Sequence, residues 1–216
     1  MPGADIDVDE GADTETQSGD DEAAWAATLR GPAQLGYSRA LAEASVSVND
    51  APTGFTAGSP NPAADYREPD VACTPDDDRE ENGEVTRLRN DTEAVGVDYR
   101  LTWTDSSEAA AAALAAWNDT PASCALTTYA SGYERALVGE SATFEGAGET
   151  AVITTTYTAS LNDRLDSVNL TYVAQVDSFL LEMVYWSFVP EPDRAAADEL
   201  FQLQIDEFLR VYDHAS

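Results

Sequence analysis

The sequence predicts an α+β domain in which a mainly antiparallel sheet is covered by two main helices, one of them C-terminal. Alternation of apolar and polar residues indicates strands with one buried face, most clearly over residues 95–104 and 168–176. An alanine-rich segment, residues 109–117, and an amphipathic segment, residues 190–212, have the pattern of helices. We expect both helices to lie on one side of the sheet.

Several segments have the alternation or the composition of strands: residues 85–89, 95–104, 150–159, 168–176 and 179–189. The last three predict an antiparallel meander. Only Asp177 and Ser178 separate its second and third strands, which is short enough for a tight hairpin turn. Residues 179–189 are apolar on both faces, as a central strand would be.

Both helices have recognisable start signals. Asp105 or Ser106 can cap the first helix, Glu108 lies in its first turn, and the helix should end between residues 118 and 121. The second helix should begin at Pro190, because proline is tolerated in a first turn. Its apolar residues fall on one face, which should lie across the sheet: Ala197, Phe201, Ile205, Phe208, Leu209 and Tyr212.

The chain divides into an acidic tail and one domain. Residues 1–22 contain nine acids and no base, so they bury too little apolar surface to offset the entropy of ordering and should be disordered. Residues 23–216 form the single domain. Within it, residues 49–83 are rich in proline, glycine and acids, which predicts a long, mostly irregular loop.

The charge of the chain excludes two classes of partner. The 216 residues include 41 acids and 11 basic residues, all arginine, for a net charge of -30. Such a surface repels phosphate backbones and anionic bilayers, so binding to nucleic acid or electrostatic docking on a membrane is disfavoured. No apolar run of transmembrane length occurs, so direct membrane insertion is not expected. A salt-rich habitat or a GC-rich actinobacterial genome explains the composition equally well.

Catalytic and metal-binding patterns are weak. His214 is the only histidine and lies next to the C-terminus, which disfavours triads and histidine-ligated zinc. Asp5, Asp7 and Asp9 have the spacing of a calcium loop, but the glycine and the bidentate glutamate that the loop requires are misplaced. The loop at residues 145–149 is acidic and cannot hold phosphate, so it should be a turn. We therefore expect no catalytic residues, metal or cofactor, and a protein that is not an enzyme.

The two cysteines, Cys73 and Cys124, lack a CxxC spacing and a neighbouring histidine, so a disulfide between them is favoured over metal or redox chemistry. The bridge would close about 50 residues and stabilise the fold by roughly 4 kcal/mol. It would also place the domain outside the reducing cytoplasm. The alternative is two separate buried thiols.

Aromatic residues are the remaining candidates for a site. They occur throughout the predicted sheet and its helix: Tyr99, Trp103, Trp117, Tyr157, Tyr172, Tyr185 and Trp186. Most should belong to the core. We expect Tyr99, Trp103, Tyr172 and Trp186 to line a ligand cleft that would receive a small apolar or glycan ligand.

Three stretches resemble the PknH-like extracellular sensor domains and related actinobacterial surface lipoproteins. They are LRGPAQLGY at residues 29–37, the strand and helix that lead to Cys124, and the hairpin from residue 169 to 188 with the helix after it. The resemblance implies a disulfide-stapled antiparallel sheet with two helices, a cleft for an extracellular ligand and no enzymatic activity. Family members often have four cysteines, and their hairpin turn is frequently Gly-Asn, where this chain has two cysteines and Asp177-Ser178.

The resemblance also implies export to the cell surface. We expect the acidic tail to be a spacer after a lipid-anchored cysteine or a membrane segment. The first hypothesis is accordingly a non-enzymatic, extracytoplasmic ligand-binding or sensor-like domain. The alternative is a structural or protein–protein interaction module on the cell surface, and a hydrolase with paired carboxylates is the least favoured.

Overall fold

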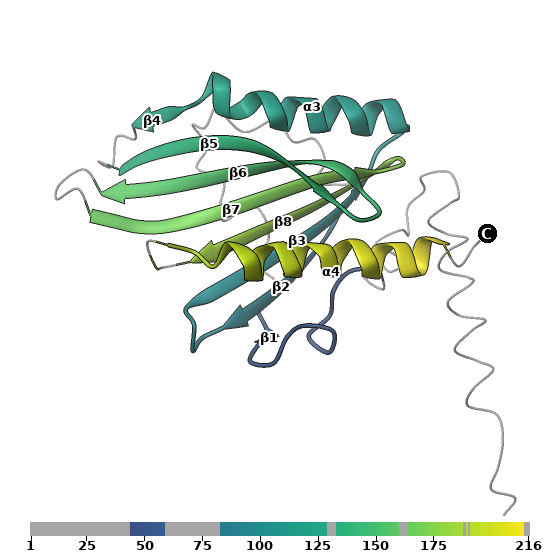
Figure 1. The fold of residues 1–216 in the computed structure, drawn as a ribbon, viewed down its shortest axis with the longest axis horizontal. Helices are drawn as coiled ribbons and strands as arrows, with labels where there is room; N and C mark the ends of the chain where they lie inside the picture. Colours follow the sequence, from purple (N-terminus) through teal and green to yellow (C-terminus); the bar gives the residue numbers. More distant parts are fainter. Residues whose placement is uncertain are drawn as a thin grey trace, which may run out of the picture.

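The computed structural model describes residues 44–58, 83–128, 133–159, 164–187, 189 and 191–213 (Figure 1). The acidic tail at residues 1–22, His214 and most of the loop at residues 49–83, including Cys73, lie outside the described residues. Among the helices described, none combines the length and the apolar character that crossing a bilayer requires.

Within the residues that the structure describes, the architecture is an antiparallel sheet with two helices, which confirms the predicted α+β class. The described ranges contribute eight strands to the sheet, in the order β1-β2-β3-β8-β7-β6-β5-β4, and every neighbouring pair is antiparallel. The strands are β1 (Thr56–Ala57), β2 (Gly83–Asn90), β3 (Val95–Trp103), β4 (Leu126–Thr128), β5 (Tyr133–Phe144), β6 (Gly148–Ala159), β7 (Arg164–Val176) and β8 (Phe179–Ser187).

Strand β8 joins two meanders in one sheet. It pairs with β3 on one side and β7 on the other, so the strand predicted to be central is central. Val176 pairs with Phe179, which leaves Asp177 and Ser178 as a two-residue turn. Asp177 has a φ of 52°, the left-handed conformation that tight hairpin turns use. The predicted hairpin is therefore confirmed.

Helix α4 (Arg194–Asp213) covers one face of the sheet. Its buried residues, Phe201, Ile205 and Phe208 among them, pack against inward-facing side chains of β3, β8 and β7. The helix begins later than the predicted Pro190 because Asp193 caps it, accepting a hydrogen bond from the backbone N–H of Ala196 at 3.0 Å.

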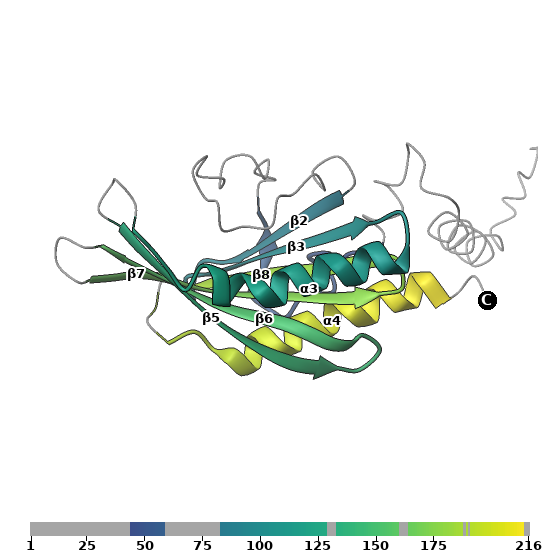
Figure 2. The same cartoon turned by 90° about the horizontal axis from the view of Figure 1, so that it is seen from above.

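Helix α3 (Ser107–Ser123) lies on the opposite face, so the prediction that both helices lie on one side of the sheet is wrong (Figure 2). Its Trp117 packs with Ile153, Val173 and Leu180, whose neighbours Val152, Tyr172 and Leu181 face α4. Successive strand residues point to opposite faces, so apolar residues at adjacent positions create two buried layers. The sheet is the middle layer of three.

Two further predictions need correction. Ser106 caps α3 as expected, accepting a hydrogen bond from Ala109 N–H at 3.1 Å, but the helix continues through Pro121 to Ser123. The second meander also begins earlier than predicted, because β4 and the twelve-residue strand β5 precede β6. The predicted turn at residues 145–149 is present but shorter: it spans residues 145–147, because Gly148 and Glu149 already pair with β5 as the start of β6.

Candidate functional site

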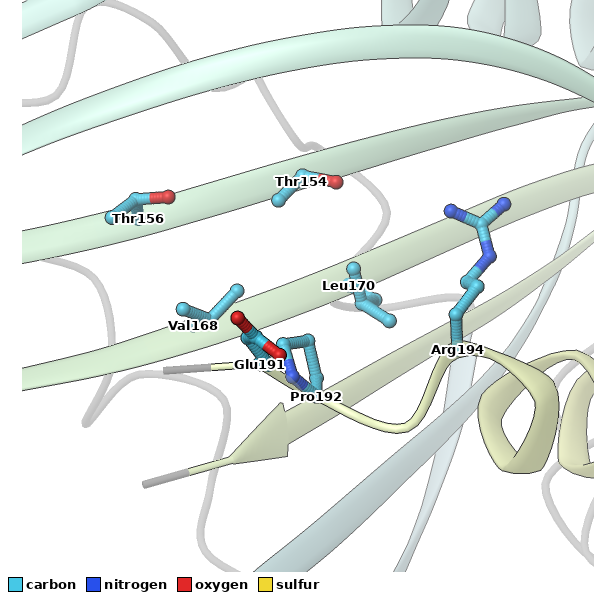
Figure 3. Close-up of a pocket in the computed structure, with 7 residues that line it drawn as sticks. All are labelled: Thr154, Thr156, Val168, Leu170, Glu191, Pro192 and Arg194. Atoms are coloured by element: carbon cyan, nitrogen blue, oxygen red, sulfur yellow. The ribbon is translucent and has the colours of Figure 1, made fainter. Parts of the chain in front are cut away.

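An open groove of about 400 Å³ lies on the α4 face of the sheet in the described part of the chain. We call it the threonine groove and define it by the residues that line it: Thr154, Thr156, Val168, Leu170, Glu191, Pro192 and Arg194 (Figure 3).

The register of β6 and β7 forms the floor of the threonine groove. Thr154 pairs with Leu170, and Thr156 pairs with Val168, so two hydroxyls and two aliphatic side chains form a square. All four have even numbers and therefore point to the α4 face, like Tyr172, which packs against the helix. The floor combines apolar surface with groups that can donate or accept hydrogen bonds.

The segment between β8 and α4 forms the wall. Glu191 and Pro192 stand beside Val168, and Arg194, the first residue of α4, points across the groove toward β6 (Figure 3). Because Asp193 caps the helix, the position of Arg194 is set by the helix start.

Arg194 is held in place by two carboxylates and a ring. Its Nε donates to Asp198 Oδ1 at 2.8 Å, one helical turn away, and its Nη1 donates to Glu140 Oε1 of β5. Its guanidinium carbon lies 5.2 Å from the ring centroid of Tyr172, within cation–π range. Partial burial lowers the pKa of Arg194, but the hydrogen bonds to Asp198 and Glu140 raise it more, so the side chain stays charged.

Tyr172 of β7 is also part of this hydrogen-bond network. Its ring is fully buried, and its hydroxyl donates to Asp198 Oδ1 at 2.7 Å. Burial, and next the hydrogen bond to the carboxylate of Asp198, raise the pKa of the Tyr172 hydroxyl well above its usual value. Tyr172 is therefore a neutral donor that orients Asp198, and Asp198 orients Arg194.

The charges around the threonine groove are mostly negative. Arg194 is compensated by Glu140 and Asp198, and Glu191 is exposed with no ion-pair partner among the residues described. A negative rim disfavours anionic ligands and tolerates neutral or cationic ones. No three side chains of His, Cys, Asp or Glu gather in the described residues as a metal site would require.

Comparisons with known proteins assign no family. No protein-family model matches the chain, and no curated protein matches its sequence. The extracellular domain of PknH from Mycobacterium tuberculosis is a distant structural neighbour, with 9% sequence identity and a TM-score of 0.39. The match covers 57% of this chain and 63% of that structure, less than two thirds of its length.

The four aromatic residues expected to line a cleft do not line the threonine groove. Tyr99 and Tyr172 are buried under α4, where the hydroxyl of Tyr99 donates to the carbonyl oxygen of Leu200 at 3.3 Å. Trp103 is half-buried against the same core cluster. Trp186 pairs with Gly96 and, by the alternation of β8, points to the α3 face, away from the other three.

The cysteines fall partly outside the described residues. Cys124 is buried at the C-terminal cap of α3 and is disulfide-bonded. Cys73 lies outside the described residues, so its pairing with Cys124 stays a prediction. Asp5, Asp7 and Asp9 and the C-terminal His214 also lie outside the described residues, so the expectations about them stay predictions.

The residues that form the threonine groove were missed by sequence reasoning. Glu140 belongs to β5, a strand that was not predicted, and it meets Arg194 only through the fold. Thr154 and Thr156 were assigned to a strand but not to a site. A weak signal existed in the alternation Thr154, Thr156, Thr158 on β6, which gives one face of a strand an unusual row of hydroxyls.

Proposed function

We propose that this protein is a non-enzymatic ligand-binding or sensor-like domain and that the threonine groove is its binding site. The observation that carries the proposal is the groove itself: a concave surface whose apolar and hydroxyl-bearing floor ends at a fixed arginine. Sites for small molecules are typically concave, mostly apolar and fitted with a few fixed polar groups.

The floor favours a small apolar or glycan ligand. Val168 and Leu170 offer aliphatic contact, and Thr154 and Thr156 can exchange hydrogen bonds with hydroxyl groups. The apolar surface continues onto β5, because Val138 pairs with Thr154 and is 67% exposed. A neutral molecule with an aliphatic part and hydroxyls fits this surface, and the net charge of -30 disfavours an anion.

We also propose an extracytoplasmic location, at the surface of the cell. A disulfide at Cys124 fits an oxidising compartment. The three sequence stretches that resemble PknH-like sensor domains support the same location. Iodoacetamide labelling of unreduced protein from its native source tests it, because cysteines that react would contradict an oxidising compartment.

The binding proposal can be tested with two probes, octyl glucoside and maltose, titrated into isotope-labelled protein and followed by NMR. Amide shifts confined to β6, β7 and residues 191–194 are expected. Saturable binding of octyl glucoside alone identifies an apolar ligand, and binding of maltose identifies a glycan. Thr156→Trp should fill the groove and abolish binding, whereas Thr143→Trp, on the exposed face of β5, should not. The proposal would be contradicted if neither probe shifted the amide signals, or if Thr156→Trp left binding unchanged.

A specific observation favours the second candidate, a structural or protein–protein interaction module. Leu126 and Val138 are 64% and 67% exposed, and both point to the α4 face at the β4–β5 side of the sheet. Exposed large apolar residues of this kind are typical of contact surfaces.

A further inference from the structure

The outer edge of β5 carries backbone groups without a neighbouring strand. Strand β4 pairs only with residues 134–136 of β5, although β5 continues to Phe144. The backbone N–H of Leu137 points outward, because it donates to the carbonyl oxygen of Ala125 at 3.0 Å. Backbone groups alternate in direction along a strand, so those of Gly139, Ser141 and Thr143 point outward too.

These outward groups are accessible and unpaired. Gly139, Ser141 and Thr143 are exposed, and no backbone hydrogen bond from them to the outer side is present in the described residues. Pairing between β5 and β6 runs without a bulge from Tyr133 to Phe144, so the backbone groups along this edge alternate regularly. It also lacks the proline and lysine residues that commonly protect exposed edges.

The edge is rigidly held at its far end. Gln202 of α4 accepts a hydrogen bond from the backbone N–H of Glu145 and donates one to its carbonyl oxygen, both at 3.1 Å. Leu209 of α4 packs against Gly146 in the same turn. In the middle of the strand, Glu140 forms an ion pair with Arg194. A strand fixed in this way loses little conformational entropy when it binds a partner.

Acidic side chains border the edge on both faces. Glu140 lies on the α4 face, and Glu149 lies on the α3 face, where its Oε1 accepts a hydrogen bond from the Ser141 hydroxyl at 3.2 Å. The nearest cation, Arg194, is already compensated by Glu140 and Asp198. Because Glu140 and Asp198 share a single arginine, the α4 face keeps an excess of negative charge, and basic side chains on either face of an added strand would meet it.

We infer that the outer edge of β5, residues 139–143, accepts an extended basic segment of another protein as an additional strand. Main-chain hydrogen bonds would supply affinity, and the acids on both faces would supply the preference for basic residues. Pro121 of α3 packs against Gly139, so the partner needs a small residue next to Gly139 on the α3 face. Two copies of this chain pair poorly there, since each carries the same acids and a charge of -30.

Peptides of about ten residues, at the upper end of usual strand lengths and long enough to span residues 139–143, test the inference with the full chain. The first alternates lysine with threonine and valine, the second has glutamate in place of lysine, and the third is the lysine peptide with alternate amides N-methylated. Fluorescence anisotropy at physiological salt should show binding of the first peptide only. N-methylation should weaken binding about tenfold or more, because it removes main-chain hydrogen bonds.

Ser141→Pro provides a matched test on the protein side. Proline removes the outward N–H, and an edge strand tolerates it because that N–H is not used within the sheet. It should weaken binding of the lysine peptide about tenfold, whereas Ser141→Ala, which keeps the N–H, should not. Binding of octyl glucoside in the threonine groove should be unchanged in both variants, so failure of one proposal is distinguishable from failure of the other.

Hydrogen exchange locates the contact. The lysine peptide should slow exchange at the amides of Gly139, Ser141 and Thr143. Equal binding of the N-methylated peptide would show nonspecific attraction to an acidic surface and would overturn the inference, as would no binding of the lysine peptide. A dimer of the unliganded chain that Ser141→Pro abolishes, seen by analytical ultracentrifugation, would assign the edge to a second copy instead.

Discussion

Gly96 leaves the space in which the indole ring of Trp186 lies: a Cβ atom at position 96 would be 1.8 Å from Cζ2 of Trp186. The two residues face each other in the register of β3 and β8. The guanidinium of Arg89 lies 5.5 Å from the centroid of the same ring, so the indole is bordered by a cation as well.

Gly96→Ala should therefore displace the ring and lower the free energy of unfolding by about 1–3 kcal/mol, the usual cost of overpacking. Urea denaturation measures this change, and a shift in tryptophan emission reports the displaced indole. In a Trp186→Leu background the same substitution should cost much less, because the clashing atoms are gone. An equal cost in both backgrounds would show that Trp186 is not the cause.

Arg135 on β5 is a cation whose burial is uncompensated in the described residues. It is 6% exposed, and its Nε and Nη2 atoms are buried without a hydrogen-bond partner. Leu137, two residues later, belongs to the α3-side core, so Arg135 points to the same face. Arg135→Met keeps much of the volume and removes the unpaired donors.

We expect Arg135→Met to leave stability unchanged or to raise the free energy of unfolding by about 1–3 kcal/mol, since unsatisfied buried polar groups cost roughly that much. Chemical denaturation measures it. Arg87→Met is the control, because Arg87 is equally buried but paired with Asp98, and it should destabilise. A loss of stability in Arg135→Met similar to that of the control would mean that Arg135 has a partner in solution.

The predicted bridge between Cys73 and Cys124 also has a measurable consequence. On the chain-entropy model, a disulfide that closes a loop of about 50 residues raises the free energy of unfolding by roughly 4 kcal/mol. The double variant Cys73→Ser/Cys124→Ser should lose about this amount in urea denaturation, and dithiothreitol should destabilise the wild type but not the variant. Insensitivity of the wild type to the reductant would contradict the bridge.

The parts of the fold that sequence predicted are those with a local cause. Residues 168–176 alternate cleanly, Asp177-Ser178 suits a two-residue turn, and Ser106 is a good helix cap. Strand β5 was missed because Gly139, Glu140 and Ser141 have little strand propensity, and its pairing with β6 imposes the extended conformation. The opposite placement of the helices has a sequence signal in Ile153 and Val173, apolar residues on the second face of their strands, which form a second core under α3.

The threonine groove could not be predicted in this way, because its geometry is entirely tertiary. Arg194 meets Glu140 through the crossing of α4 over the sheet, and the floor depends on the register that sets Thr154 against Leu170. Aromatic residues are the usual sequence signal for a ligand site, but here they belong to the core. Tyr99 and Tyr172 fill the layer under α4.

The buried tyrosines predict how stability depends on pH. Burial raises the pKa of Tyr99, and burial followed by the hydrogen bond to Asp198 raises that of Tyr172, whereas tyrosines of the unfolded chain titrate near pH 10. The folded state thus keeps protons that the unfolded state loses above about pH 10. Stability from these groups is fully present below that pH and falls as the pH rises above it.

Above pH 10, each such tyrosine makes the free energy of unfolding fall by about 1.4 kcal/mol per pH unit, because the unfolded state has lost one proton that the folded state keeps. Tyr172→Phe should make the alkaline decline of the unfolding free energy shallower by about that amount, and Tyr99→Phe should add a similar change. Urea denaturation at a series of pH values measures the slopes. Below about pH 9 the slopes of wild type and variants should agree, because neither state of either protein loses a tyrosine proton there. Parallel declines above pH 10 would mean that Tyr172 ionises as readily in the folded protein as in the unfolded chain, and the hydrogen bond that orients Asp198 would then not persist in solution.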